Sequence, residues 1–242
     1  MLKKILLFVA ILGLLSLLSG CLYPDDRLAE NRIPYKDQIT MVQNAVDQFK
    51  EAEGGILPIK TKENSTPIFQ KYVIDFNKLS PRFIAEPPSS AFEGGGIFQY
   101  VLVDVETEPT VKLIDLTAVD VIRDLKLRIK FYTEENHYPP YKEPLDQEKG
   151  YYILDYDKLG YDNTIPFVKS PFSGKNLSLF IDTKGEIYVD YSPDLYEALK
   201  TFEHDYKTGD DIRYLLVANY DFVPAFSVPY TIKDNEPIFL TE

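Results

Sequence analysis

The sequence predicts an α+β fold with two tandem units, each a helix followed by an antiparallel hairpin, and a partial third unit at the C-terminus. Apolar residues recur at helical spacing twice, over residues 39–49 and 119–132. Each stretch is followed by a pair of short apolar segments around a turn, which is typical of a β-hairpin. Short segments of the two halves also resemble each other in the same order. This arrangement favours antiparallel sheets packed against helices.

The similarity between the halves predicts an internal duplication. Residues 73–79 (VIDFNKL) resemble residues 153–159 (ILDYDKL), 80 positions later. The other two pairs of similar segments are 49–58 with 131–140, offset by 82, and 98–104 with 176–182, offset by 78. Short deletions in one copy would produce such a steady drift of the offset. Chance similarity between apolar segments is the alternative explanation.

The first unit is expected over residues 35–117. Its helix should begin with Asp37 as N-cap and end at Gly54 and Gly55. The apolar face of that helix consists of Ile39, Val42, Val46 and Phe49. A hairpin should follow, with strands at 98–105 and 111–116 and a turn near Glu108 and Pro109.

The second unit is expected over residues 118–192, and the partial third unit over residues 193–242. The second helix should end at Asn136, before Pro139 and Pro140, and the second hairpin should pair 177–182 with 186–191. In the third unit, Leu195, Leu199 and Phe202 share one helical face. Strands or extended segments are expected there at 212–217, 226–232 and 237–240.

The N-terminal residues 1–20 have the pattern of a cleaved export signal. Lys3 and Lys4 precede an apolar run at 5–18 that is shorter than the roughly 20 residues of a membrane-spanning helix. Leu18-Ser19-Gly20-Cys21 resembles the lipobox of bacterial lipoproteins. The resemblance implies that Cys21 receives a diacylglycerol and becomes the new N-terminus. Residues 21–34, rich in proline and charge, are then expected to be an extended tether. An ordinary secretory signal is the alternative.

This lipid anchor predicts a location at the outer face of the cytoplasmic membrane. Two acyl chains, at about 0.8 kcal/mol per buried CH₂, hold a protein lastingly on a bilayer. Cys21 is the only cysteine in the sequence. The exported part is therefore expected to contain neither a disulfide nor a thiolate site.

The chain is acidic, with a formal net charge of −12. Residues 1–20 hold two of the 26 basic residues and none of the 38 acidic ones, so removing them would give −14. Such a charge excludes nucleic acid as a partner, because its phosphates are bound by clustered lysine and arginine. The expected partners are the membrane, through Cys21, and an envelope protein or wall polymer.

None of the catalytic motifs sought in the sequence is present. His137 and His204 are the only histidines and are far apart, so no multi-histidine zinc site is expected. The acidic segment 155–162 fails the calcium-loop pattern, because Leu159 takes its fifth position and Pro166 its twelfth. The sequence therefore predicts no enzyme activity, no cofactor and no metal.

Tyrosines are concentrated between residues 138 and 161, among several prolines. Of these, Tyr138, Tyr141 and Tyr151 are the candidate contact residues for a protein or a glycan, since exposed tyrosines are common in interfaces. Packing in the core is the alternative role for each of them.

Two further resemblances concern the family. Residues 134–140, with Glu134, Tyr138 and Pro139, and the hairpin segment 184–188 are similar to the globular head of type II secretion pseudopilins. As a whole, the chain is similar to small uncharacterised lipoproteins of Gram-positive bacteria, a resemblance that implies no activity. The function expected from the sequence is a non-enzymatic binding or adaptor module. A solute-binding lipoprotein of a transporter and a hydrolase with an unrecognised site are the alternatives.

Overall fold

The computed structural model describes residues 35–161 and 164–240. The expected signal peptide, Cys21 and the tether at 21–34 lie outside the described residues. Within these ranges, the residues from Lys36 onward belong to one compact unit. None of the helices in the described ranges has the length and apolar content needed to cross a membrane.

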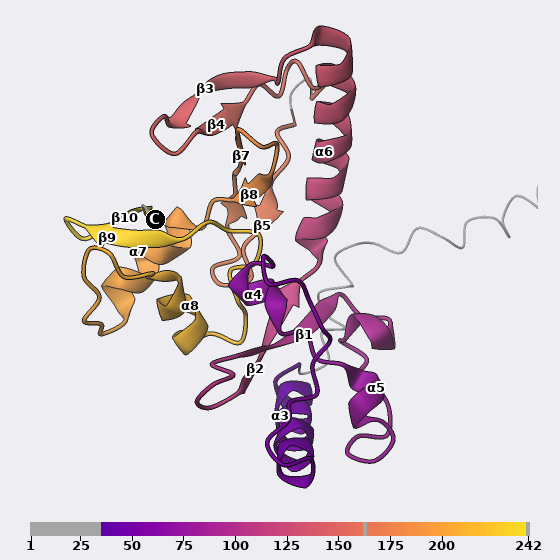
Figure 1. The fold of residues 1–242 in the computed structure, drawn as a ribbon. Helices are drawn as coiled ribbons and strands as arrows, with labels where there is room; N and C mark the ends of the chain where they lie inside the picture. The colour runs from indigo at the N-terminus through magenta and orange to yellow at the C-terminus, as the bar shows by residue number, and fades with distance from the viewer. Residues whose placement is uncertain (1–34, 162–163, 241–242) are drawn as a thin grey trace, which may run out of the picture. The chain divides into compact units, whose positions relative to one another are not determined.

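The structure combines helices with antiparallel hairpins, which confirms the predicted α+β class (Figure 1). The first half contains α3 (Tyr35–Ala52), α4 (Ile68–Lys71), α5 (Phe76–Leu79), the 3₁₀ helix η1 (Phe92–Gly94), β1 (Phe98–Val103) and β2 (Thr110–Asp115). The second half contains α6 (Thr117–Asn136), β3 (Tyr141–Asp146), β4 (Tyr151–Leu154), β5 (Val168–Lys169), β6 (Asn176–Leu177), β7 (Leu179–Asp182) and β8 (Ile187–Val189). The C-terminal part contains α7 (Ser192–Thr201), α8 (Arg213–Asn219), β9 (Tyr230–Lys233) and β10 (Glu236–Phe239).

The two long helices form where the apolar spacing predicts them. Helix α3 begins two residues before Asp37, which therefore lies in the first turn instead of capping it. Helix α6 ends at Asn136 as predicted. His137 follows with φ +65° and donates its backbone N–H to the Thr133 carbonyl, and the two prolines after it cannot continue the helix.

Both predicted hairpins are present and antiparallel. Strands β1 and β2 pair from Phe98 opposite Asp115 to Val103 opposite Thr110. Strands β7 and β8 pair from Leu179 opposite Val189 to Ile181 opposite Ile187. In the second half, β7 also pairs with β4, and the order across the four-stranded sheet is β3-β4-β7-β8. The β3–β4 hairpin was not predicted from the sequence, because its proline and charged residues hide the strand pattern.

The same strand order recurs in the first half as isolated bridges. Ile59 bridges Ile74, and Val73 bridges Val101, both antiparallel. In the second half, Tyr141 pairs with Leu154, and Ile153 pairs with Phe180, which is one residue after Leu179, the residue aligned with Val101. A hydrogen bond recurs as well: Asp75 N–H donates to the Pro58 carbonyl at 2.7 Å, and Asp155 N–H to the Pro140 carbonyl at 2.8 Å. The aligned segments therefore make similar backbone contacts in both halves, with a shift of one residue in the third segment.

Each face of the β1–β2 hairpin is covered by other parts of the chain. Helix α3 lies along β2, where the Gln43 side chain accepts from Val111 N–H at 2.8 Å and donates to the Pro109 carbonyl at 3.0 Å. The opposite face packs with the C-terminal part in a hydrophobic cluster, here called the second cluster to distinguish it from the core of the second half. This cluster contains Phe69, Val73, Val101, Val103, Ile114, Val217, Val223 and Ala225.

The core of the second half lies between α6 and its sheet. Buried side chains of α6, among them Ile122 and Leu125, pack in one cluster with Leu154 and Ile181 of the sheet. The strand residues that alternate with these point to the other face. There Phe180 contacts Phe239 of β10, with ring centroids 5.3 Å apart.

Residues 221–226 connect the two hairpins. Leu113 of β2 donates its N–H to the Asp221 carbonyl at 2.9 Å and accepts from Val223 N–H at 3.0 Å. At the other end, Val189 of β8 donates to the Phe226 carbonyl at 2.8 Å. Just before this segment, the strand predicted at 212–217 is wrong, because these residues form most of α8. Leu215, Leu216 and Val217 are consecutive and buried, so the apolar run resembles a strand.

Candidate functional site

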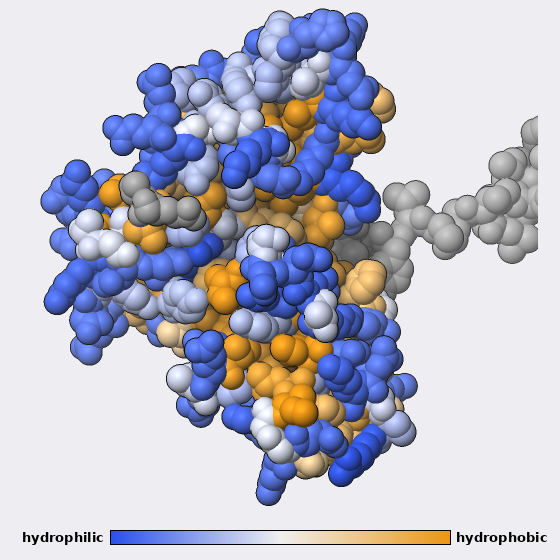
Figure 2. Space-filling model, viewed as in Figure 1, coloured by the Kyte–Doolittle hydropathy of each residue, from blue (hydrophilic) through white to orange (hydrophobic). Residues whose placement is uncertain are grey.

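The candidate site is a groove between α4, the turn after β1 and α8. Its volume is about 290 Å³. Figure 2 shows hydrophobic residues at the surface around α4, beside hydrophilic ones. Buried Phe69, Leu102 and Val103 form the apolar part of the lining, and half-buried Tyr72 and Tyr214 stand beside them. We refer to this site as the α4 groove.

The aromatic side of the α4 groove is held by packing within the second cluster. Phe69 and Tyr214 meet edge to face, with ring centroids 5.3 Å apart. The guanidinium of Arg213 lies 4.9 Å from the centre of the Phe69 ring. That guanidinium is nearly buried, pairs with Asp211 at 2.6 Å and donates to the Ser227 carbonyl at 3.1 Å. These contacts fix the ring positions before any ligand arrives.

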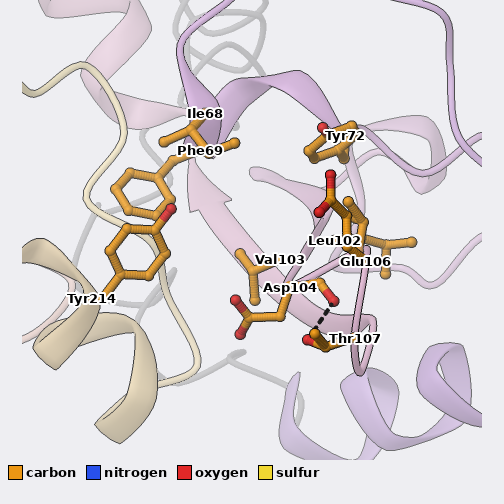
Figure 3. A pocket seen from close by; sticks show the side chains of 10 residues that line it. Ile68, Phe69, Tyr72, Leu102, Val103, Asp104, Glu106, Thr107 and Tyr214 are labelled. Carbon is orange, nitrogen blue, oxygen red and sulfur yellow. Dashed lines mark hydrogen bonds between the residues drawn. The ribbon is translucent and has the colours of Figure 1, made fainter.

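The acidic side of the α4 groove comes from the turn between β1 and β2. Asp104 has φ +52°, a left-handed conformation that aspartate tolerates better than most residues. Its carbonyl accepts from the backbone N–H of Thr107 at 3.0 Å, which closes the turn. Figure 3 shows the Asp104 carboxylate directed to the side of Tyr214 and the Glu106 carboxylate to the side of Tyr72.

Both carboxylates are exposed, and no donor within the described part of the chain bonds to either of them. The ammonium of Lys112 donates to the Tyr220 carbonyl at 2.7 Å. Burial lowers the pKa of Lys112, and the negative charges of Asp221 and Asp104 oppose that shift. Asp104 therefore interacts electrostatically with Lys112, whose ammonium already bonds to the Tyr220 carbonyl.

Tyr214 remains protonated at neutral pH. Burial raises the pKa of its hydroxyl, the charge of Asp211 raises it further, and Asp104 adds a smaller effect in the same direction. The α4 groove thus offers neutral phenol rings next to two carboxylates. Such a combination attracts cations through the ring faces and through direct charge pairing. Across residues 35–161 and 164–240, no group of three or more histidine, cysteine or acidic side chains could hold a metal ion.

The tyrosines singled out in the sequence do not share one face. Tyr141 stacks on Tyr152, with ring centroids 4.3 Å apart, whereas Tyr151 contacts Phe239 at 5.0 Å on the opposite face of the sheet. Tyr138 is 52% exposed and touches the Tyr132 ring at 5.7 Å. Tyr138 thus presents the most open surface of the three, and its contact role stays a prediction.

The α4 groove was not anticipated from the sequence. The signal that could have indicated it is the turn at 104–109, where Asp104, Glu106 and Glu108 alternate with other residues in a predicted hairpin loop. Loops carry binding residues disproportionately. The contribution of Tyr214, more than 100 positions later, depends on the packing of α8 and has no local signal.

Comparison with known proteins gives one match. Residues 35–115 match the model of the YphF family N-terminal domain. The matched segment runs from α3 to β2 and contains every residue named above for the lining except Tyr214. No curated protein and no solved structure matches the chain.

Proposed function

We propose that this chain is a lipid-anchored extracytoplasmic lipoprotein without enzymatic activity, which binds another component of the cell envelope. Cys21 would carry the lipid and hold the protein at the outer face of the cytoplasmic membrane. Residues 36–242 would then present a binding surface beyond the headgroups. The lipobox-like segment at 18–21 supports the anchor, and the α4 groove supports the binding role.

The open α4 groove is the observation that carries the binding role. It is hydrophobic at its base and charged at its rim, as the contact regions of protein interfaces commonly are. Phe69 is held by Arg213 and packs against Tyr214, so binding would cost little ordering of these two side chains. Of the two expected partners, a protein fits this groove better than a wall polymer, which would need a longer surface.

The two alternative functions are less well supported by this geometry. A solute-binding lipoprotein encloses its ligand, whereas the α4 groove is open to solvent along its acidic side. A hydrolase with paired carboxylates requires one of them to be held as the neutral acid, usually by burial. Asp104 and Glu106 are both exposed.

The family assignment can also be refined as a proposal. The YphF-type match at 35–115 and the lipobox-like segment together favour the group of small uncharacterised lipoproteins of Gram-positive bacteria. We further propose that the similarity to pseudopilin heads concerns only the local arrangement of α6 and the β7–β8 hairpin, and not filament assembly.

Chemical crosslinking in intact cells tests the proposed function. The tagged full-length chain would be crosslinked, captured and analysed by mass spectrometry together with the proteins attached to it. We expect one envelope protein in near-equal amount. A Cys21→Ser variant should lose metabolic incorporation of labelled fatty acid and leave the membrane fraction.

The outcomes separate the alternatives. A transporter permease as the main partner would favour the solute-binding function. No enriched partner under any crosslinking condition would contradict the adaptor function. Retention of label and membrane association in the Cys21→Ser variant would contradict the lipid anchor.

A further inference from the structure

We propose that the α4 groove binds a basic side chain, a lysine or an arginine, of a protein partner. This inference rests on the proposed function and specifies the chemistry of the partner. It assigns separate roles to the two sides of the groove. The apolar base would cover the stem, the tyrosine rings would contact the cationic head, and Asp104 with Glu106 would pair with the charge.

The rings of the α4 groove already attract the chain's own cations. Arg213 lies over Phe69, with its guanidinium 4.9 Å from the ring centre, and Lys71 lies over Tyr72 at 5.7 Å. Among the described residues, no such cation lies over Tyr214. Its ring is also the one toward which the Asp104 carboxylate is directed (Figure 3). A cation at this position would contact a ring and a carboxylate at the same time.

The charges around the α4 groove favour a positive ligand. Lys112, whose pKa is affected by the charge of Asp104, already donates to the Tyr220 carbonyl, and Lys71 lies over the Tyr72 ring. Asp221 offsets the charge of Lys112 further. The net charge of −12 for the whole chain adds a long-range attraction for a basic partner.

The size of the groove limits its occupant to one or two side chains. At about 290 Å³ it lies at the lower end of small-molecule sites. An extended lysine or arginine would bury its methylene stem along Phe69 and Leu102 and keep its head at the acidic rim. Phosphate and carboxylate ligands would be repelled by Asp104 and Glu106.

Titration of the full-length chain with a blocked tetra-arginine peptide tests this inference. Binding would be measured by calorimetry at low and at physiological salt. The test variant is Asp104→Asn with Glu106→Gln. The matched control is Glu134→Gln with Glu135→Gln, which removes the same charge from exposed positions at the end of α6. Circular dichroism would verify that both variants are folded.

We expect the Kd for the peptide to rise at least tenfold in the groove variant and less than twofold in the control. Higher salt should weaken binding to the unaltered chain. Equal weakening in both variants would overturn the inference, because net charge alone would then explain binding. Unchanged binding in the groove variant, or tighter binding of a neutral glycan oligomer at the same residues, would also overturn it.

Crosslinking of the groove variant in cells distinguishes this inference from the proposed function. A partner that is captured by the unaltered chain and lost from the groove variant would support both. A partner captured equally by both chains would contradict the role of the α4 groove and leave the adaptor function standing. The absence of a partner for the unaltered chain would contradict the adaptor function itself.

Discussion

Asp104 and Asp182 are aligned in the two similar segments, and each follows the last apolar residue of the first strand of its hairpin, yet their surroundings differ. Asp182 is buried and closes its own turn, accepting from the N–H groups of Lys184 at 2.8 Å and Glu186 at 2.9 Å. Its second oxygen accepts from the Tyr188 hydroxyl at 3.1 Å. Asp104 is exposed at the α4 groove, and its carboxylate has no such donors among the described residues. Asp182 thus stabilises the fold of its hairpin, whereas Asp104 is available for binding.

The covering elements explain this difference. In the second half, an aromatic cluster of Tyr151, Tyr188 and Phe239 surrounds Phe180 and fills the sheet face. In the first half, Val101 bridges Val73 as Phe180 pairs with Ile153, and the covering elements α4 and α8 meet without closing over the turn. The first half has a smaller strand residue covered by two short helices, which leaves a groove. In the second half, large aromatic rings fill the corresponding space.

The largest expected effect on stability comes from the sheet face that carries Phe180. Phe180→Ala should lower the free energy of unfolding by about 3–5 kcal/mol, because it removes a fully buried ring from the aromatic cluster. Val101→Ala in the first half should cost only about 1–2 kcal/mol, since fewer buried methyl groups are lost. Urea denaturation followed by circular dichroism measures both. Equal losses would show that the two faces are packed alike.

Replacement of each aspartate by asparagine tests their separate roles. Asp182→Asn should cost about 1–2 kcal/mol, because charge-assisted hydrogen bonds within a buried turn are weakened. Asp104→Asn should change stability by less than about 0.5 kcal/mol, and asparagine tolerates the left-handed backbone equally well. Thermal unfolding of both variants gives the comparison. A larger loss for Asp104→Asn would mean that this carboxylate serves the fold after all.

A buried acid after β8 should make stability depend on pH. Burial raises the pKa of Asp194, against the hydrogen bonds from Ser173 and Ser170, the latter at 2.7 Å. The charge of Lys175 also opposes the shift, and that of Asp190 adds to it. The folded state holds this proton more tightly than the unfolded state, so stability should fall as pH rises from near 3.8 through the raised pKa.

Asp194→Asn tests this dependence. The variant should be more stable than the unaltered chain by about 1 kcal/mol at neutral pH, and the difference should vanish near pH 4. Denaturation curves at several pH values provide the measurement. A difference that is constant with pH would show that the proton on Asp194 is not responsible.

The smallest effect on stability is expected at Tyr138. The ring is more than half exposed, so Tyr138→Ala should cost less than about 1 kcal/mol, mainly through the lost contact with Tyr132. Partner capture by this variant should be compared with capture by Tyr214→Ala. If only the Tyr138→Ala variant lost the partner, the binding surface would lie in the second half and not at the α4 groove.

Local patterns predicted the α+β class, the two long helices and the two main hairpins. They also predicted the aligned segments, because the shared Asp-x-x-Lys-Leu pattern lies in similar local structure. The β3–β4 hairpin was missed, since Pro144 and charged residues break its alternation and its partner β7 lies about 30 positions away. The strand expected at 212–217 was wrong, because tertiary packing buries the whole apolar run as a helix.

The candidate site shows the same limit. Asp104 and Glu106 lie in a predicted turn, so the acidic side of the α4 groove could have been predicted from the sequence. The other half depends on Tyr214, which α8 brings to β1 through contacts between Phe69, Val103 and Val217. No periodicity or spacing encodes such a long-range contact. The tyrosine cluster favoured by composition instead divides between two faces of a sheet.

The position of residues 221–226 has a consequence for how the chain acquires its structure. Backbone groups of Leu113 and Val189 find their partners only in this late segment. A chain synthesised from its N-terminus therefore carries both hairpins with unsatisfied strand edges until residues 221–226 have emerged. Unpaired edges invite contact with other chains. The emergence of residues 221–226 thus sets the time during which the protein needs protection from association.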